Sequence, residues 1–140
     1  MNIFDTTILE KYLRVIREAA HECECADNEE KGGVILYKDS DFKFIKLENK
    51  HKGTSTSYAL YEVNPKEFGM IMTEYVAKGW RLFSSFHTHP SFPPTPSSTD
   101  MTYLFPGYKY NTIYSKLNKV FNITVWIEDK VVGFHTLNYV

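Results

Sequence analysis

The chain has 140 residues, of which 43% are hydrophobic and 24% charged, and its formal net charge is −1. This length predicts one domain, residues 1–140, with a core of its own. The charges are spread evenly, so the chain has no basic patch to bind nucleic acid. No apolar run fits a membrane span or a signal peptide. We therefore expect a cytoplasmic protein that binds neither nucleic acid nor a membrane.

The only cysteines, Cys23 and Cys25, are separated by a single residue. Cysteines at that spacing rarely form a disulfide, and an isolated C-x-C is a weak signal for metal. We therefore expect neither a disulfide nor a cysteine metal site, which fits a reducing cytoplasmic setting.

The N-terminal segment has the apolar spacing of an amphipathic helix over residues 7–23. Thr7 and Glu10 form a capping-box pattern at its start. The apolar stripe consists of Leu9, Leu13, Ile16 and Ala20. Such a stripe predicts a helix that packs one side on the core.

Three strand patterns follow, with a polar loop before the third. The apolar run GGVILYK at residues 32–38 predicts a buried strand, and DFKFIKLE at residues 41–48 predicts a second one. NKHKGTSTS at residues 49–57 is expected to form a polar loop. SYALYEV at residues 57–63 returns to a strand pattern.

A second helix is predicted after the third strand pattern. Asn64 and Pro65 form the usual pair of an N-cap and a first-turn proline, and Gly79 is placed to end the helix. Its apolar face consists of Phe68, Ile71, Met72, Tyr75 and Val76. This spacing places all five side chains on one side of the helix.

The last part of the chain predicts a strand, a short helix and three more strands. The strand covers residues 81–89, and the short helix begins at Ser97 and stops before Pro106. The final strands are KYNTIYS at 109–115, FNITVWIE at 121–128 and KVVGFHTL at 130–137, with a tight turn at Asp129–Lys130. This order predicts a mixed α/β domain with one main sheet and helices on its faces.

The stretch FHTHPSFPPTPSSTD, residues 86–100, has two interpretations. In the structural interpretation, a strand ends, prolines stiffen a turn, and Ser97 with Asp100 caps a helix. In the metal-site interpretation, His87 and His89 share one face of the strand because strand side chains alternate. Each piece taken alone favours the structural interpretation.

The combination of pieces favours the metal site. Two imidazoles at i and i+2 can reach one ion, and Asp100 in the first turn of the next helix can supply a third ligand. A His₂Asp set with an open fourth position is typical of catalytic zinc, which lowers the pKa of a water molecule to about 7.

The pattern H-x-H-x₇-S-x-x-D, with H-T-H-P inside it, resembles the signature of the JAMM (JAB/MPN+, Mov34-type) zinc metalloproteases. The matching positions are His87, His89, Pro90, Ser97 and Asp100. The resemblance covers most of residues 30–138. It implies a single JAB/MPN-type domain with an α/β (α+β), cytidine-deaminase-like fold, in which one mixed β-sheet is flanked by helices.

The same family carries an upstream glutamate in a pattern near E-x-x-G-x-L. Glu30 fits it, because Gly33 stands three positions later and apolar residues follow. Glu29 places Gly32 at the same offset but aligns the apolar run less well, so it stays open as the alternative. The family often has a further Gly where this chain has Tyr37, which bears on strand packing and not on chemistry.

The resemblance implies one zinc per chain, held by His87, His89 and Asp100. Glu30 would act as the general base and Ser97 would stabilise the oxyanion. The implied reaction is hydrolysis of the peptide or isopeptide bond after the C-terminal diglycine of a ubiquitin-like protein. The compact chain resembles stand-alone prokaryotic JAB proteins. This resemblance implies E1-like and E2-like partners of a bacterial ubiquitination-like or antiphage system. Members of the family often dimerise, so a homodimer stays open.

Three other classes of protein share parts of these patterns. A non-catalytic MPN scaffold has the same fold but typically lacks a ligand, whereas this chain keeps the full set. A PHP-type phosphoesterase needs more metal ligands than His21, His51 and His135 can add. A RadC-like DNA-associated protein typically shows H-N-H-P-S-G, and the chain has H-T-H-P-S-F. We expect His51 to be solvated and His135 to be packed or exposed at an edge.

The neighbours of the histidines are expected to serve packing. Thr88 should face the core, on the side of the strand opposite the histidines. Phe86 and Phe92 flank the motif and are interpreted as packing residues, with a substrate groove as the alternative.

Overall fold

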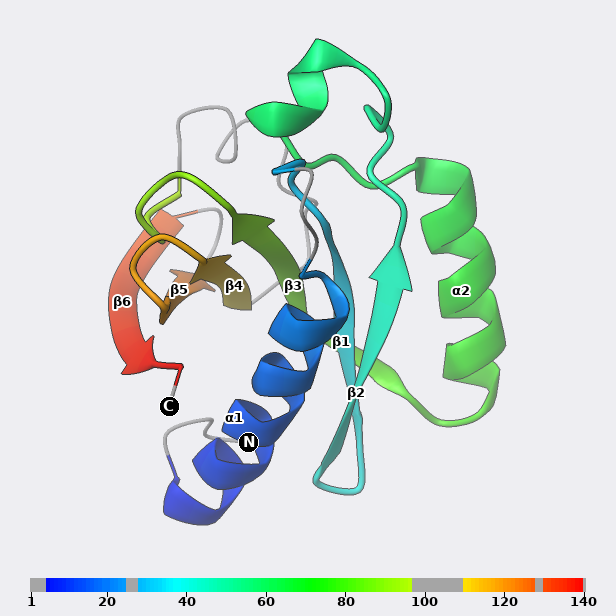
Figure 1. Cartoon of the computed structure of the whole chain (residues 1–140). Helices are drawn as coiled ribbons and strands as arrows, with labels where there is room; N and C mark the ends of the chain where they lie inside the picture. The colour runs from blue at the N-terminus through cyan, green and yellow to red at the C-terminus, as the bar shows by residue number, and fades with distance from the viewer. Residues whose placement is uncertain (1–4, 25–27, 97–109, 128–129, 140) are drawn as a thin grey trace.

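The computed structural model describes residues 5–24, 28–96, 110–127 and 130–139 (Figure 1). Its elements are α1 (Thr6–Glu22), β1 (Gly32–Lys38), β2 (Asp41–Leu47), a 3₁₀ turn (Ser55–Tyr58), α2 (Pro65–Ala77), β3 (Arg81–His89), β4 (Tyr110–Ser115), β5 (Val120–Ile127) and β6 (Lys130–Asn138). Among the described helices, none has the length and apolar character needed to cross a membrane.

The six strands form one sheet in the order β2-β1-β3-β4-β5-β6. β1 pairs antiparallel with both β2 and β3, β3 runs parallel to β4, and β5 and β6 continue antiparallel. The prediction of one mixed sheet flanked by helices is therefore confirmed. β3, which carries the histidine pair, lies in the middle of this sheet.

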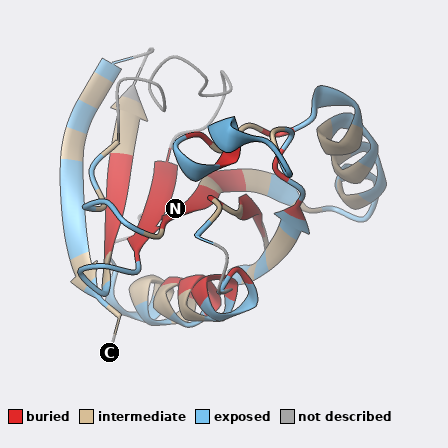
Figure 2. Cartoon of the chain, turned by 45° about the horizontal axis from the view of Figure 1, so that its top comes forward, coloured by how far each residue is buried: buried red, intermediate tan, exposed pale blue. Residues whose placement is uncertain are grey.

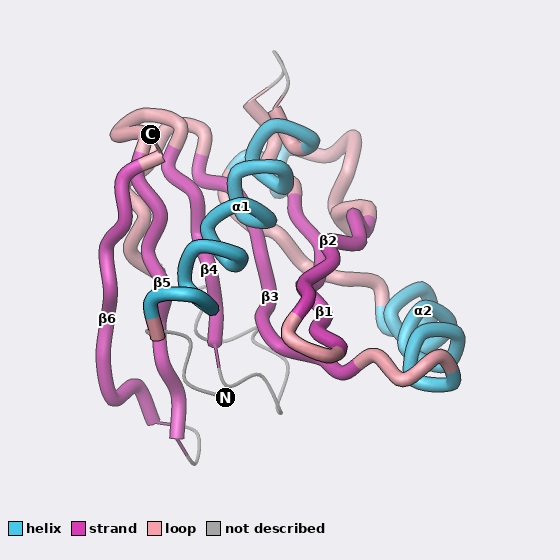
Figure 3. The backbone as a smooth tube through the Cα atoms, turned by 90° about the horizontal axis from the view of Figure 1, so that it is seen from below, coloured by secondary structure: helices cyan, strands magenta, loops and turns pink. Residues whose placement is uncertain are grey.

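The two helices cover opposite faces of the sheet. Successive side chains of a strand point to opposite sides, so one strand contributes to both cores. Ile35 packs in the core under α1, while Val34 and Leu36 pack in a second core under α2. Figure 3 shows α1 lying across the strands and α2 beside β1 and β2. Buried residues gather on the central strands and the inner side of α1, whereas β6 and α2 have none (Figure 2).

Helix α1 differs from the sequence-based expectation in its cap and its buried face. Asp5 caps it by accepting hydrogen bonds from the amides of Thr7 and Ile8 at 3.1 and 3.5 Å, so the predicted Thr7–Glu10 capping box is wrong. The N-cap lies two residues before Thr7, where the carboxylate of Asp5 bonds to amides of the first turn that have no partner within the helix. The buried residues are Tyr12, Val15, Ile16, Ala19 and Ala20. Leu9 and Leu13 lie at the margin of this face.

Helix α2 begins and ends as predicted. The Asn64 side chain accepts from the amides of Lys66 and Glu67, Pro65 opens the first turn, and Gly79 follows the helix with a φ of +91°. Four of the five predicted apolar residues pack against the second core, but Val76 is 49% exposed. It lies in the last turn of the helix, which ends at Ala77.

The predicted strand at residues 57–63 does not form. The segment begins in the 3₁₀ turn and pairs only through an isolated bridge between Asn49 and Val63. Its apolar alternation is real, but its main-chain groups at Leu60 and Glu62 bond to the side chain of Asn49 rather than to a strand. The helix predicted from Ser97 and the turn at Asp129–Lys130 lie outside the described residues.

A buried tyrosine links α1 to the sheet and makes stability sensitive to high pH. The hydroxyl of Tyr12 lies 2.5 Å from Oγ1 of Thr112. Burial, more than any other influence, raises the pKa of Tyr12 above its ordinary value of 10.0. The folded protein therefore keeps this proton at pH values where the unfolded chain releases it.

We expect the free energy of unfolding to fall as the pH rises above about 10, by about 1.4 kcal/mol per pH unit from this group. Because the folded pKa is raised, its contribution is complete below the unfolded pKa and is lost above it. Tyr12→Phe should lose about 1 kcal/mol at pH 7 but respond less to alkali. Urea unfolding between pH 7 and 11 tests this, and parallel pH profiles would contradict it.

Candidate metal centre

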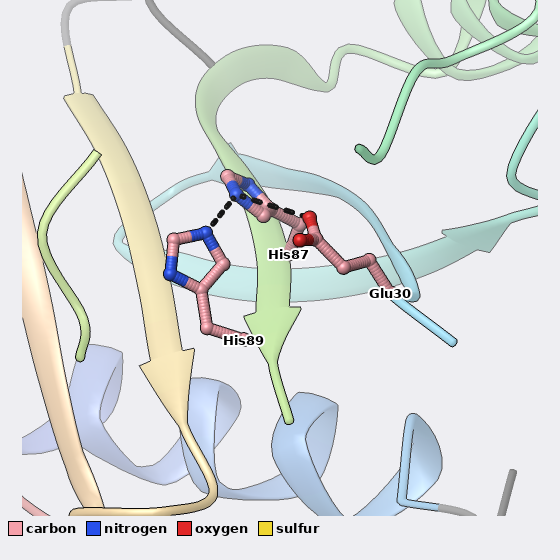
Figure 4. Close-up of side chains that lie close together, drawn as sticks. All are labelled: Glu30, His87 and His89. Atoms are coloured by element: carbon pink, nitrogen blue, oxygen red, sulfur yellow. Dashed lines mark hydrogen bonds and ion pairs between the residues drawn. The ribbon is translucent and has the colours of Figure 1, made fainter. Parts of the chain in front are cut away.

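Three buried side chains converge beside the end of β3 (Figure 4). Nε2 of His87 lies 3.1 Å from Nε2 of His89 and 3.9 Å from Oε1 of Glu30. Glu30, His87 and His89 are 1%, 7% and 3% exposed. One donor atom from each lies within 4.8 Å of the other two, so the described residues contain a group that can hold a metal ion.

The pairing of β1 with β3 brings these side chains to one face of the sheet. Gly32 lies opposite His87, so Glu30, two residues earlier, is placed on the same face as the histidines. Thr88 points to the other face, where it is buried as expected. Its Oγ1 accepts from the amide of Lys31 at 3.1 Å, which ties the segment next to Glu30 to β3.

Gly32 allows β1 to approach β3 closely at the site. A Cβ atom at this position would lie 2.0 Å from the carbonyl oxygen of Phe86 and 2.9 Å from Cβ of His87. Gly33 is similarly close to β2, where a Cβ would lie 2.0 Å from the carbonyl oxygen of Ile45. The two glycines of the E-x-x-G region therefore serve strand packing.

Hydrogen bonding sets the form in which His89 presents itself. Its Nδ1 lies 2.8 Å from the carbonyl oxygen of Pro93, which can only accept. Nδ1 therefore carries the hydrogen, and a neutral His89 directs the lone pair of Nε2 toward His87. An imidazole that binds a metal through one nitrogen usually donates a hydrogen bond of this kind through the other.

The geometry of the pair fits one bound ion. Two nitrogens at about 2.0–2.1 Å from a tetrahedral zinc would lie about 3.3 Å apart, close to the observed 3.1 Å. Imidazole nitrogens and a carboxylate are ligands that zinc accepts. The two imidazoles thus suit zinc and leave further coordination positions available, and the Glu30 carboxylate lies beside them.

His87 is also held by an aromatic ring. The ring of Tyr61 stacks on it with centroids 6.0 Å apart and an interplanar angle of 12°. The hydroxyl of Tyr61 donates to the carbonyl oxygen of Leu47 at 2.8 Å. Sequence reasoning missed Tyr61. Residues 57–63 were expected to form a strand, and that expectation gives no reason to place Tyr61 beside the histidines.

A cavity of about 350 Å³ opens beside the metal centre. Its walls come from Glu30, Ala59, His89, Phe92, Pro93, Thr95 and Pro96. Phe92 is 48% exposed and its ring stands at 85° to that of His89, so the expectation that it serves packing is wrong. Phe86 is fully buried in the core under α1, as expected.

The structure brings together three of the five predicted site residues: Glu30, His87 and His89. Ser97 and Asp100 lie outside the described residues. The alternative glutamate, Glu29, is only partly buried. It lines a small cavity beside Thr88 on the α1 face and also borders a second pocket that Glu30 shares.

The other histidines do not join the described metal group. His135 is exposed on the edge strand β6, as expected. His51 was expected to be solvated, but its side chain is only 26% exposed and its Nε2 lies 2.8 Å from Oε1 of Glu62. The isolated bridge between Asn49 and Val63 brings these two side chains together.

Comparisons with known proteins assign the family. The model of the prokaryotic homologues of the JAB domain matches residues 12–128. No curated protein matches the chain. The solution structure of a Desulfitobacterium hafniense protein is similar, with a TM-score of 0.61 and 20% identity over 94% of this chain and 86% of that chain.

Two further solved structures show weaker similarity. A Salinibacter ruber protein gives a TM-score of 0.48 at 19% identity over 97% of this chain and 88% of that one. A JAB1/MPN domain protein from Archaeoglobus fulgidus gives 0.44 at 17% identity over 92% and 83%. The family match covers most of the sequence, including the glutamate and both histidines, and so the chain belongs to the prokaryotic JAB-domain family.

Proposed function

We propose that this protein is a zinc-dependent peptidase that hydrolyses the peptide or isopeptide bond after the C-terminal diglycine of a ubiquitin-like protein. The observation that carries the proposal is the buried pair of imidazole nitrogens 3.1 Å apart with the Glu30 carboxylate beside them. Membership of the JAB-domain family supports it. A solvated or structural histidine pair would not need a buried carboxylate at the same point.

His87 and His89 would hold the zinc through Nε2, and the spacing of the sequence motif proposes Asp100 as the third ligand. Zinc in such a site supplies Lewis acidity, which lowers the pKa of a water molecule and polarises a carbonyl group. The hydrogen bond to Pro93 keeps the His89 ring in the form and orientation that this binding needs.

Glu30 would act as the general base. It would accept the proton of the attacking water on its carboxylate and return that proton to the leaving amine, so that no net proton is consumed by the side chain. It lies beside the histidines and is 1% exposed, so little of its side chain meets bulk water. Ser97 is proposed, from its motif position, to stabilise the oxyanion.

The lining of the cavity beside the site supports a substrate with a diglycine segment. Its wall is formed mainly by Ala59, Phe92 and prolines, whose side chains offer apolar contacts rather than charges. A diglycine segment lacks Cβ atoms, so its backbone can lie flat against such a wall. The ubiquitin-like partner, and E1-like and E2-like enzymes acting with it, are part of this proposal.

Zinc content tests the proposal first. We expect about one zinc per chain in wild type purified without chelator, and loss of that zinc in His89→Ala because one ligand is removed from a buried site. His135→Ala is the matched control, since it removes an exposed histidine elsewhere in the sheet. Zinc that persists in His89→Ala, or none in wild type after zinc is supplied, would contradict the metal site.

Substrate cleavage is the second measurement. Ubiquitin-like proteins extended beyond their diglycine, or joined through it to lysine, should be cleaved by the zinc-loaded wild type and not by His89→Ala. A zinc-loaded protein that binds such partners without cleaving them would favour the non-catalytic scaffold instead.

A further inference from the structure

A buried asparagine in the turn after β2 bonds to four main-chain groups. Asn49 is 6% exposed. Its Nδ2 donates to the carbonyl oxygens of Glu30 at 3.0 Å and Leu60 at 2.8 Å. Its Oδ1 accepts from the amides of His51 at 3.0 Å and Glu62 at 3.3 Å. Both donors and the acceptor are used, which defines the orientation of the amide.

Two hydrogen bonds hold the main chain of Glu30 from opposite sides. Its carbonyl oxygen accepts from Asn49, and its amide donates to the carbonyl oxygen of Ser57 at 2.8 Å. Glu30 lies before the start of β1 at Gly32. Its main chain is therefore positioned by the segment at residues 49–63, which lies outside the regular strand pairing.

The same segment reaches the metal centre at a second point. Tyr61, which follows Leu60, stacks on His87 and is anchored through its hydroxyl to Leu47. Asn49 links the two points, since it bonds to Glu30 on one side and to Leu60 and Glu62 on the other. A shift of Asn49 would thus move the carboxylate relative to the histidines.

We propose that Asn49 is a positioning residue that places the Glu30 carboxylate for proton transfer. The proposal rests on the proposed peptidase function for its kinetic consequence, but its structural part stands without it. A general base must lie within hydrogen-bonding distance of the proton it takes, and a displacement of about 1 Å can cost about 10²-fold in rate. Asn49 bonds to the main chain of Glu30 and is not a member of the described metal group.

The test combines hydrogen exchange with kinetics in Asn49→Ala and Asn49→Asp. Asp keeps the size and the acceptor but removes both donors, so it tests the hydrogen bonds even where Ala disturbs folding. Exchange of the Glu30 amide, measured by NMR relative to the amides of β4, should rise at least about tenfold in both variants. Zinc content should stay at the wild-type level, because the histidines are unchanged.

With a cleavable substrate, kcat should fall by about 10²-fold in both variants while KM changes by less than about threefold. His51→Ala is the matched control. It removes the contact between Nε2 of His51 and the Glu62 carboxylate in the same segment. It leaves every hydrogen bond of Asn49, whose partner at residue 51 is the main-chain amide. Its kcat and its Glu30 exchange should match wild type.

The two proposals can fail separately. Wild type that binds no zinc or cleaves no substrate overturns the peptidase function, while faster Glu30 exchange in the Asn49 variants still supports the positioning by Asn49. Unchanged exchange at Glu30 in both variants overturns the positioning, whatever the activity. An equal loss of kcat in His51→Ala also overturns it, since the segment as a whole would then be responsible.

Discussion

Glu30→Gln should lower kcat by about 10²–10⁴-fold while the zinc content stays at the wild-type level. Gln has the same shape as Glu but cannot take up and return a proton. It also leaves His87 and His89 in place, so metal binding and proton transfer are separated in one variant. Zinc analysis and kcat on an extended ubiquitin-like substrate measure the two effects side by side.

Glu29→Gln is the matched control, and it also tests the alternative base. Glu29 lies next in the sequence but is not part of the described group with the histidines. Its substitution should leave kcat within about twofold of wild type. Loss of activity in Glu29→Gln with retention in Glu30→Gln would reverse the assignment, and full activity in both would remove the glutamate from the mechanism.

Gly32→Ala should lower the free energy of unfolding by about 3 kcal/mol, the upper part of the range for overpacked sites. The added Cβ would meet the carbonyl oxygen of Phe86 at 2.0 Å, and main-chain atoms cannot move aside as a flexible side chain can. β1 must therefore shift away from β3, and the His87 side of the metal centre opens with it. Urea unfolding measures the change, and we also expect weaker zinc binding.

Gly69→Ala provides the matched control for the same chemical change. Gly69 lies within α2, and nothing lies within 4 Å of the position that its Cβ would take. Because Ala favours helix over Gly, this variant should gain up to about 1 kcal/mol. Equal stability changes in both variants would show that the close approach of β1 to β3 is not what Gly32 provides.

Local patterns in the sequence predicted much of this protein correctly. Alternation in residues 81–89 placed His87 and His89 on one face, and Asn64, Pro65 and Gly79 marked the ends of α2. Such signals depend on neighbours along the chain, so they can be recognised without knowing what packs where. The spacing of the histidine motif also predicted the family, which the match to residues 12–128 confirms.

The tertiary structure alone decided how the site is supported. Glu30 meets the histidines because β1 pairs with β3, and the bond between Lys31 and Thr88 joins residues 57 positions apart. Asn49 reads in the sequence as a polar loop residue, yet it is buried and bonds to Glu30. Hydrogen bonds between distant segments leave no periodicity in the sequence, because each partner is chosen by the fold and not by its neighbours along the chain.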